Sequence, residues 1–235
     1  MIARLPRWSS GQRIGLLGGT FNPPHEGHLL ISLYALKRLR LDRVWWVVTP
    51  GNPLKDNERL PGLAARLADA RALARDPRIA VTGFEAAIGA RYTADTIAFL
   101  RRRAPEVHFV WLMGADNLRQ FHRWRRWRAL AASAPIAVVD RPGSTLSALA
   151  APAALYLAKF RVPESRAASF PERAAPAFIF LHGPQSMLSS SAIRRDEAAL
   201  KAVEKRAATA HVLRRPPAFT GGLKEGQDTD FLADH

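Results

Sequence analysis

The chain has 235 residues, 48% of them hydrophobic, which is enough to bury one sizeable core and predicts one folded domain. It contains no cysteine, which excludes disulfide bonds and thiolate zinc sites. No run approaches the roughly 18 consecutive apolar residues of a membrane-spanning helix, and Met1 to Gly11 lack the apolar stretch of a signal peptide. We therefore expect a cytoplasmic protein without a membrane partner.

The formal net charge of +15 permits two kinds of partner, nucleic acid or phosphorylated small molecules. Arginine is abundant along the whole chain, including the expected helix surfaces that carry Arg66, Arg71, Arg75 and Arg101 to Arg103. We predict a solvated basic surface, and keep a basic nucleic-acid-binding protein as the alternative of a different class.

Short apolar runs alternate with helical patterns along most of the chain. The expected strands are 13–18, 44–49, 78–82, 107–113, 135–139 and 177–181, and the expected helices are 29–39, 61–75, 93–103 and 124–132. This alternation predicts an α/β fold with a doubly wound parallel sheet, whose ligands bind beyond the carboxyl ends of the strands. Residues 141–176 fit neither pattern, and we expect a partly helical excursion or a mobile loop there.

The residues after the first expected strand form the most informative motif. The string reads Gly18-Gly19-Thr20-Phe21-Asn22-Pro23-Pro24-His25-Glu26-Gly27-His28. Glycines allow a ligand to approach the backbone closely, and a helix start offers unpaired N–H groups to phosphate oxygens. We predict a phosphate cradle, with both histidines on the same side of the helix. The alternative is a tight turn followed by histidines that lie on the surface or bind zinc.

This string is similar to the Gly-x-Phe-x-Pro-x-His-x-Gly-His signature of the nucleotidyltransferase superfamily, which binds ATP there. The resemblance implies that six residues of the motif contact ATP: Gly18, Gly19, Thr20, Phe21, His25 and His28. It also implies that the two histidines are catalytic. Asn22 stands where many relatives carry aspartate, and the resemblance assigns it to the mononucleotide site.

A second motif lies far along the chain, at Leu188-Ser189-Ser190-Ser191-Ala192-Ile193-Arg194. Serines before an apolar, helix-compatible stretch are favoured N-caps, so an ordinary capped helix would have the same sequence. Together with the first motif, the segment resembles the Ile-Ser-Ser-Thr-x-Ile-Arg signature of the same superfamily. The resemblance implies that ATP is bound here by Ser189, Ser190, Ser191 and Arg194, and that the arginine acts on the triphosphate as a catalytic cation.

Lys55 follows the second expected strand, where its charge can neutralise phosphate. A solvated loop lysine is the alternative. The matching stretch of the nicotinate mononucleotide adenylyltransferases reads Pro-His-Lys, so the resemblance implies a catalytic and substrate-binding role for Lys55. Leu54 departs from the histidine of that pattern.

The fourth expected strand ends in Gly114-Ala115-Asp116-Asn117, with Phe121, Trp124 and Trp127 downstream. An acid placed there can hydrogen-bond a ribose hydroxyl, whereas aromatic residues at helical spacing are more often core, which is our prediction for Trp127. The string resembles the nicotinate-specific branch of the superfamily. In that branch the first tryptophan stacks on the pyridine ring, and a Tyr-Thr-x-x-Thr segment supplies backbone amides to the nicotinate carboxylate.

The resemblance therefore assigns a set of residues to the mononucleotide, in addition to Asn22 and Lys55. They are Tyr92, Thr93, Asp116, Trp124 and Arg125. The chemistry is reasonable because an electron-poor pyridinium prefers an indole face and a carboxylate prefers helix-start amides. The alternative for Thr93 is that it caps the helix that follows.

As a whole, the chain resembles the bacterial nicotinate mononucleotide adenylyltransferases, with a Rossmann-like nucleotidyltransferase fold. The resemblance implies transfer of AMP from ATP, accompanied by Mg²⁺, to nicotinate mononucleotide, giving deamido-NAD and pyrophosphate, with no obligatory nucleic acid. The alternative acceptors are nicotinamide mononucleotide and phosphopantetheine. We expect a nucleotidyltransferase domain at 12–207, an N-terminal extension at 1–11 and a flexible C-terminal tail at 208–235, where little apolar surface can be buried.

Overall fold

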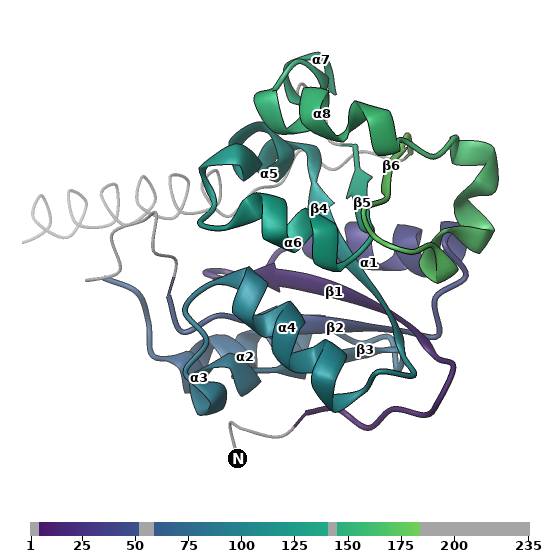
Figure 1. Cartoon of the computed structure of the whole chain (residues 1–235). Helices are drawn as coiled ribbons and strands as arrows, with labels where there is room; N and C mark the ends of the chain where they lie inside the picture. Colours follow the sequence, from purple (N-terminus) through teal and green to yellow (C-terminus); the bar gives the residue numbers. More distant parts are fainter. Residues whose placement is uncertain (1–4, 52–58, 141–144, 184–235) are drawn as a thin grey trace, which may run out of the picture. The chain divides into compact units, whose positions relative to one another are not determined.

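The computed structural model describes residues 5–51, 59–140 and 145–183. Six parallel strands form one sheet in the order β3-β2-β1-β4-β5-β6 (Figure 1). The strands are β1 (Arg13–Gly19), β2 (Arg43–Val48), β3 (Ile79–Thr82), β4 (His108–Gly114), β5 (Ile136–Val139) and β6 (Phe178–Leu181). All six lie within one residue of the expected ranges, and the strand order confirms the predicted doubly wound α/β sheet.

The sheet is apolar on both faces, which is why its strands read as continuous hydrophobic runs. Successive side chains of a strand point to opposite faces. Leu16 and Trp45 accordingly join one buried cluster, whereas Leu17 and Trp46 join the other. In register, Leu17 of β1 lies between Trp46 of β2 and Leu112 of β4, so the first strand is central.

Helices cover each of these faces. The cluster around Leu17 is covered by α1 (Glu26–Arg38), α2 (Leu63–Leu73) and the 3-10 helix η3 (Glu164–Glu172). The cluster around Leu16 is covered by α3 (Phe84–Ile88), α4 (Thr93–Arg103), α5 (Ala115–Gln120), α6 (Trp127–Ser133), α7 (Thr145–Leu149) and α8 (Pro152–Leu157). Two further 3-10 turns, η1 (Phe121–Arg123) and η2 (Ala158–Phe160), follow α5 and α8.

Several helical segments differ from the sequence-based expectation: α3 and α5 were not expected, and α2 is two residues shorter at each end than the expected 61–75. Helix α1 begins at Glu26, three residues early, because His25 caps it. The helix expected at 124–132 begins only at Trp127, because Arg126 adopts a left-handed backbone with φ 57° and interrupts the helix. Within 145–176 the chain forms α7, α8, η2 and η3, so the helical alternative is correct for the described part of that segment.

The described residues ahead of β1 lie against the domain. Leu5 and Trp8 pack against the core, and the indole Nε1 of Trp8 donates to Glu106 at 3.1 Å. The backbone N–H of Gly11 donates to the carbonyl of the same glutamate. Among the described ranges, no helix is long and apolar enough to cross a membrane.

Candidate active site

The strand order places a topological switch point between β1 and β4. From β1 the chain leads to β2 on one side, and from β4 it leads to β5 on the other. Ligands of doubly wound sheets bind in the crevice outside the carboxyl ends at such a point. The first motif begins at the carboxyl end of β1, and the Gly114-Ala115-Asp116 segment begins at the carboxyl end of β4. These two candidate segments are therefore neighbours.

Gly18 has a steric role that the sequence did not indicate. A Cβ atom on this residue would lie 2.5 Å from Cη2 of Trp111, which extends from the neighbouring strand β4. Such a contact is too short for carbon atoms, so glycine is required here by packing as well as by any approach of a ligand. Beyond the strand, buried Phe21 has φ 47° and the Asn22–Pro23 peptide bond is cis.

His25 and His28 cap the start of α1 reciprocally. The Nδ1 atom of His25 accepts from the N–H of Gly27 at 3.1 Å, and the Nδ1 atom of His28 accepts from the N–H of His25 at 3.2 Å. Their ring centroids are 3.9 Å apart. An imidazole that accepts at Nδ1 carries its hydrogen on Nε2 in the neutral form. Both rings therefore have Nε2–H donors at the positive end of a 13-residue helix, an arrangement suited to phosphate.

The His28 ring is held in place by an aromatic stack. It lies 4.5 Å from Phe21, which in turn stacks on Trp46 at 5.1 Å. Both Nδ1 atoms accept hydrogen bonds from the backbone, and the part of the chain that the structure describes contains no group of three or more His, Cys, Asp or Glu side chains able to hold a metal ion. The described residues thus give the zinc alternative no further ligands.

Arg66 is not on a solvated helix surface, so that expectation was wrong. The residue is 2% exposed, and its guanidinium donates to four backbone carbonyls: Thr20, Thr49, Pro50 and Pro61, at 2.7 to 3.0 Å. It therefore joins the first motif to the segment after β2 and to the residues before α2. Desolvation by burial lowers the pKa of Arg66 from its ordinary value. Arg66 shares the buried face of α2 with Leu67 and Ala70.

The proposed nicotinate segment begins at the start of α4. Tyr92 is the N-cap residue, Thr93 is the first helical residue, and the cap has no side-chain hydrogen bond. The alternative that Thr93 caps the helix is therefore wrong. The guanidinium of Arg125 lies over the Tyr92 ring at 5.2 Å, and Arg126 forms an ion pair with Asp95 at 2.8 Å.

These two contacts join the Trp124 loop to the first turn of α4. Trp124 is half-buried and packs edge-on against Phe121 and Trp111, with ring centroids 5.4 Å and 6.3 Å away. Trp111 also contacts Gly18. The rings of Trp111 and Trp124 therefore form a continuous aromatic contact, here called the aromatic wall, from the first motif to the expected pyridine site. Trp127 packs against the core, as predicted. The half-buried Asp116 is the second residue of α5.

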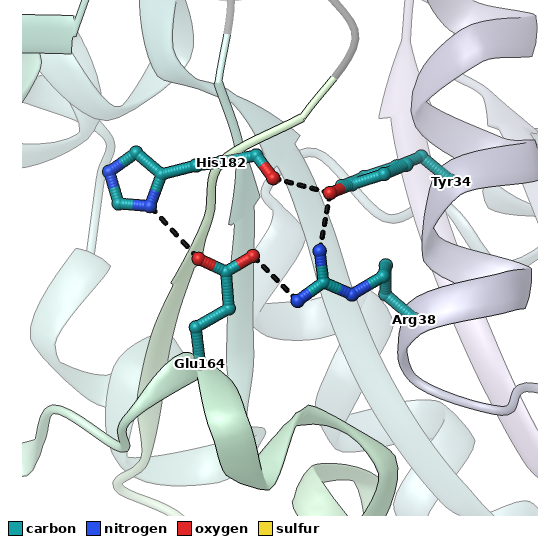
Figure 2. Close-up of polar contacts among 4 residues, drawn as sticks. All are labelled: Tyr34, Arg38, Glu164 and His182. Atoms are coloured by element: carbon teal, nitrogen blue, oxygen red, sulfur yellow. Dashed lines mark hydrogen bonds and ion pairs between the residues drawn. The ribbon is translucent and has the colours of Figure 1, made fainter.

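Five predicted site residues lie outside the described ranges: Lys55, Ser189, Ser190, Ser191 and Arg194. The end of β6, the last described strand, is held by a polar cluster that the sequence did not predict (Figure 2). Tyr34 donates to the carbonyl of His182, Arg38 donates to Tyr34 Oη at 2.5 Å, and Glu164 pairs with Arg38 at 2.8 Å and with His182 Nδ1 at 2.9 Å.

The pKa of Glu164 in this cluster is shifted below its ordinary value. Burial works to raise this pKa, but the hydrogen bonds with His182 and the positive charge of Arg38 outweigh the effect of burial. Gly183, the last described residue, lies against the Tyr34 ring, where a Cβ atom would come within 2.1 Å of Cζ. The cluster thus fixes the end of β6 against α1 and η3.

Comparisons with known proteins agree with this geometry. Residues 16–196 match the cytidylyltransferase-like family. The chain is 59% identical over 191 residues to a probable nicotinate-nucleotide adenylyltransferase of a Bradyrhizobium species, covering 81% of this chain and 100% of the relative. It is 62% identical over 182 residues to a protein of the same name from Methylorubrum extorquens, covering 77% of this chain and 98% of the relative.

The fold is shared with a distant solved structure, the Plasmodium falciparum nicotinic acid mononucleotide adenylyltransferase complexed with NaAD. The TM-score is 0.59 at 15% identity, over 78% of this chain and 83% of that one. The same enzyme complexed with APC gives a TM-score of 0.57 at the same identity, with the same shares of the two chains covered. The chain belongs to the cytidylyltransferase-like family and, within it, to the nicotinate-nucleotide adenylyltransferases.

Proposed function

We propose that this enzyme transfers AMP from ATP to nicotinate mononucleotide, giving deamido-NAD and pyrophosphate in NAD biosynthesis. The observation that carries the proposal is the arrangement at the switch point. A helix start with two Nε2–H donors, suited to phosphate, stands beside an aromatic wall that leads to Trp124 and the first turn of α4. We place the reaction in the cytoplasm, where ATP is available.

The chemistry is an in-line displacement at the α-phosphorus of ATP. A phosphate oxygen of the mononucleotide forms the new P–O bond, and the bond between the α-phosphorus and the bridging oxygen breaks, so that the electron pair leaves with pyrophosphate. The nucleophile is already an anion and needs no general base. Catalysis therefore rests on positioning and on stabilising charge in the transition state.

His25 and His28 are proposed to bind the triphosphate through Nε2–H while the start of α1 contributes its dipole. The resemblance adds the cations Lys55 and Arg194 and the backbone and hydroxyl donors of the two motifs. Gly18, Gly19, Thr20 and Phe21 would lie along the ATP site, and Ser189, Ser190 and Ser191 would contact the triphosphate.

Mg²⁺ is proposed to accompany ATP. The donor set at the described helix start consists of N–H groups, which suit phosphate oxygens rather than a cation. A magnesium ion held mainly by the phosphates and water, as is common for nucleotide substrates, fits these residues better than one enclosed by side chains. When bound, the ion would neutralise charge on the phosphate oxygens.

The pyridine ring is proposed to stack on Trp124, and the nicotinate carboxylate to accept hydrogen bonds from amides near Thr93. Tyr92, Asp116, Arg125 and Asn22 complete the proposed mononucleotide site. The Trp124 loop contacts the start of α4 through Arg125 and Arg126, so the proposed stacking surface lies next to the proposed carboxylate site.

The first test is a pyrophosphate-release assay with ATP and Mg²⁺ against a panel of acceptors. The expected result is efficient turnover of nicotinate mononucleotide and poor turnover of nicotinamide mononucleotide and phosphopantetheine. Equal rates with the acid and the amide would refute the nicotinate assignment. Salt-sensitive DNA binding without turnover of any acceptor would favour the nucleic-acid alternative.

The second test separates the capping role of His28 from its catalytic role. His28→Asn keeps an oxygen acceptor for the N–H of His25 but lacks the Nε2–H donor. We expect turnover to fall by about a hundredfold or more, the range for loss of a donor aimed at developing charge, with little change in melting temperature. His108→Asn, at the amino end of β4 on the opposite edge of the sheet, is the matched control. Near-wild-type turnover of His28→Asn would contradict the assignment.

A further inference from the structure

Glu85 is a buried carboxyl group that none of the proposed contacts with ATP or mononucleotide uses. It lies in α3, the helix that follows β3 in the chain, and is 7% exposed. A carboxyl group taken out of water destabilises a protein unless it is well hydrogen-bonded. The partners of Glu85 therefore indicate what the residue does.

Its partners are two threonines from different parts of the chain. The hydroxyl of Thr96, itself fully buried in α4, donates to Glu85 Oε1 at 2.5 Å. The hydroxyl of Thr49, the residue after β2, donates its hydrogen to the carbonyl of Gly51 at 2.8 Å, and its oxygen also lies within hydrogen-bonding reach of the Glu85 carboxyl group. Burial raises the pKa of Glu85, and the two hydrogen bonds act in the opposite direction. One side chain thus joins the start of α4 to the end of β2.

Thr49 continues this connection to the first motif. Its backbone N–H donates to the carbonyl of Gly19 at 3.0 Å, and its own carbonyl accepts from Arg66 at 2.8 Å. A chain of buried or half-buried hydrogen bonds therefore runs from Gly19 through Thr49 and Glu85 to Thr96. It connects the proposed ATP site with the helix turn proposed to receive the nicotinate carboxylate.

We propose that Glu85 is a positioning residue for the choice of acid over amide, because it holds the first turn of α4 in register with the first motif. The inference rests on the proposed function, since it concerns how the amides near Thr93 are placed. Thr96 lies one turn into α4, so loss of its anchor would let those amides shift relative to a mononucleotide whose phosphate is held at the other site. Misplacement of about 1 Å is enough to lower the rate strongly.

The test compares Glu85→Ala with the conservative variant Glu85→Gln. For Glu85→Ala, the KM for nicotinate mononucleotide should rise by about tenfold, the ratio of kcat/KM for acid over amide should fall by a similar factor, and the KM for ATP should stay within about twofold. Glu85→Gln keeps the shape of the side chain and can hydrogen-bond both threonines. It should retain the wild-type ratio to within about threefold.

Two further variants keep the test decisive if Glu85→Ala folds poorly. Thr96→Val removes only the hydroxyl on α4 and should reproduce the loss of discrimination. Leu100→Ala weakens the packing of the same helix, where Leu100 is 1% exposed, without touching the connection, and should leave the ratio unchanged. Melting temperatures report the structural cost of each variant.

An unchanged ratio in Glu85→Ala and Thr96→Val, or an equal collapse in Leu100→Ala, would overturn the inference. The wild-type enzyme separates this failure from failure of the proposed function. If wild-type protein turns over nicotinate mononucleotide with a clear acid preference and the variants keep it, only the role of Glu85 is refuted. If wild-type protein shows no such turnover, the proposed function fails first.

Discussion

Replacing Arg66 by methionine should destabilise the whole domain, although the residue lies on a helix that reads as a surface helix. The side chain makes four hydrogen bonds to backbone carbonyls, at 2.8 Å to Pro61, 2.7 Å to Thr20, 2.8 Å to Thr49 and 3.0 Å to Pro50. Methionine replaces much of the buried stem, so the loss concerns the guanidinium and its partners.

The magnitude follows from two opposing contributions. Hydrogen bonds from a charged donor contribute about 1.5 to 3 kcal/mol each, or about 6 to 12 kcal/mol for four. The desolvation of a buried guanidinium, which also lowers the pKa of Arg66, offsets several kcal/mol of this sum. A net loss of about 3 to 5 kcal/mol is expected, because the buried carbonyl groups are left without their donors. For a domain of this size it corresponds to a fall in melting temperature of about 6 to 20 °C.

Urea denaturation followed by circular dichroism measures this change directly. Arg66→Lys should not restore stability. The compact ammonium group of lysine cannot hydrogen-bond all four carbonyls that the planar guanidinium of arginine reaches. Arg71→Met, on the exposed side of the same helix, is the control and should change the free energy of unfolding by less than about 1 kcal/mol. A loss below about 1 kcal/mol in Arg66→Met would refute the reasoning.

Three other changes have equally definite outcomes. Gly18→Ala should lower the free energy of unfolding by about 1 to 3 kcal/mol through overpacking against the Trp111 ring, and a calorimetric melting temperature equal to wild type would contradict it. Trp124→Ala should weaken binding of nicotinate mononucleotide by about 1 to 3 kcal/mol while leaving ATP binding unchanged, as isothermal titration calorimetry can show; equal weakening of both ligands would mean that the site itself is distorted. The pKa of Glu164 is held below its ordinary value despite burial, chiefly by hydrogen bonds with His182, so its contribution to stability is present above the unfolded pKa and is lost as pH falls through the folded pKa. The stability difference between wild type and Glu164→Gln should therefore shrink between about pH 5 and pH 3 in acid titrations of urea unfolding, and a constant difference would argue against the ion pairs.

The sequence determined the sheet because its signals are local. Each strand is a short apolar run between turn residues, and in a parallel sheet covered on both faces such a run is sufficient to mark a strand. The first motif was equally clear, since glycines, prolines and histidines lie together in eleven consecutive residues after β1. Alternation of strands and helices then placed that motif at the carboxyl edge of the sheet.

Other features depend on residues that meet only after folding. Position 18 requires glycine because the Trp111 ring packs against it. Trp111 is 93 positions away, and sequence spacing contains no information about that contact. Trp124 precedes α6 instead of belonging to it, because Arg126, whose side chain pairs with Asp95 of α4, adopts a left-handed backbone. Helical propensity alone favours continuing the helix through this segment, and the folded structure departs from it.

Charge was the property that the sequence described least well. Arginines along a helix usually indicate solvated surface, and Arg71 and Arg75 follow that rule. Arg66 does not, because the turn after β1 and the segments flanking the loop after β2 present carbonyl groups that need buried donors. Composition determined how many charges the chain carries. Only the tertiary structure decided which of them are solvated by water and which are hydrogen-bonded by backbone carbonyl groups.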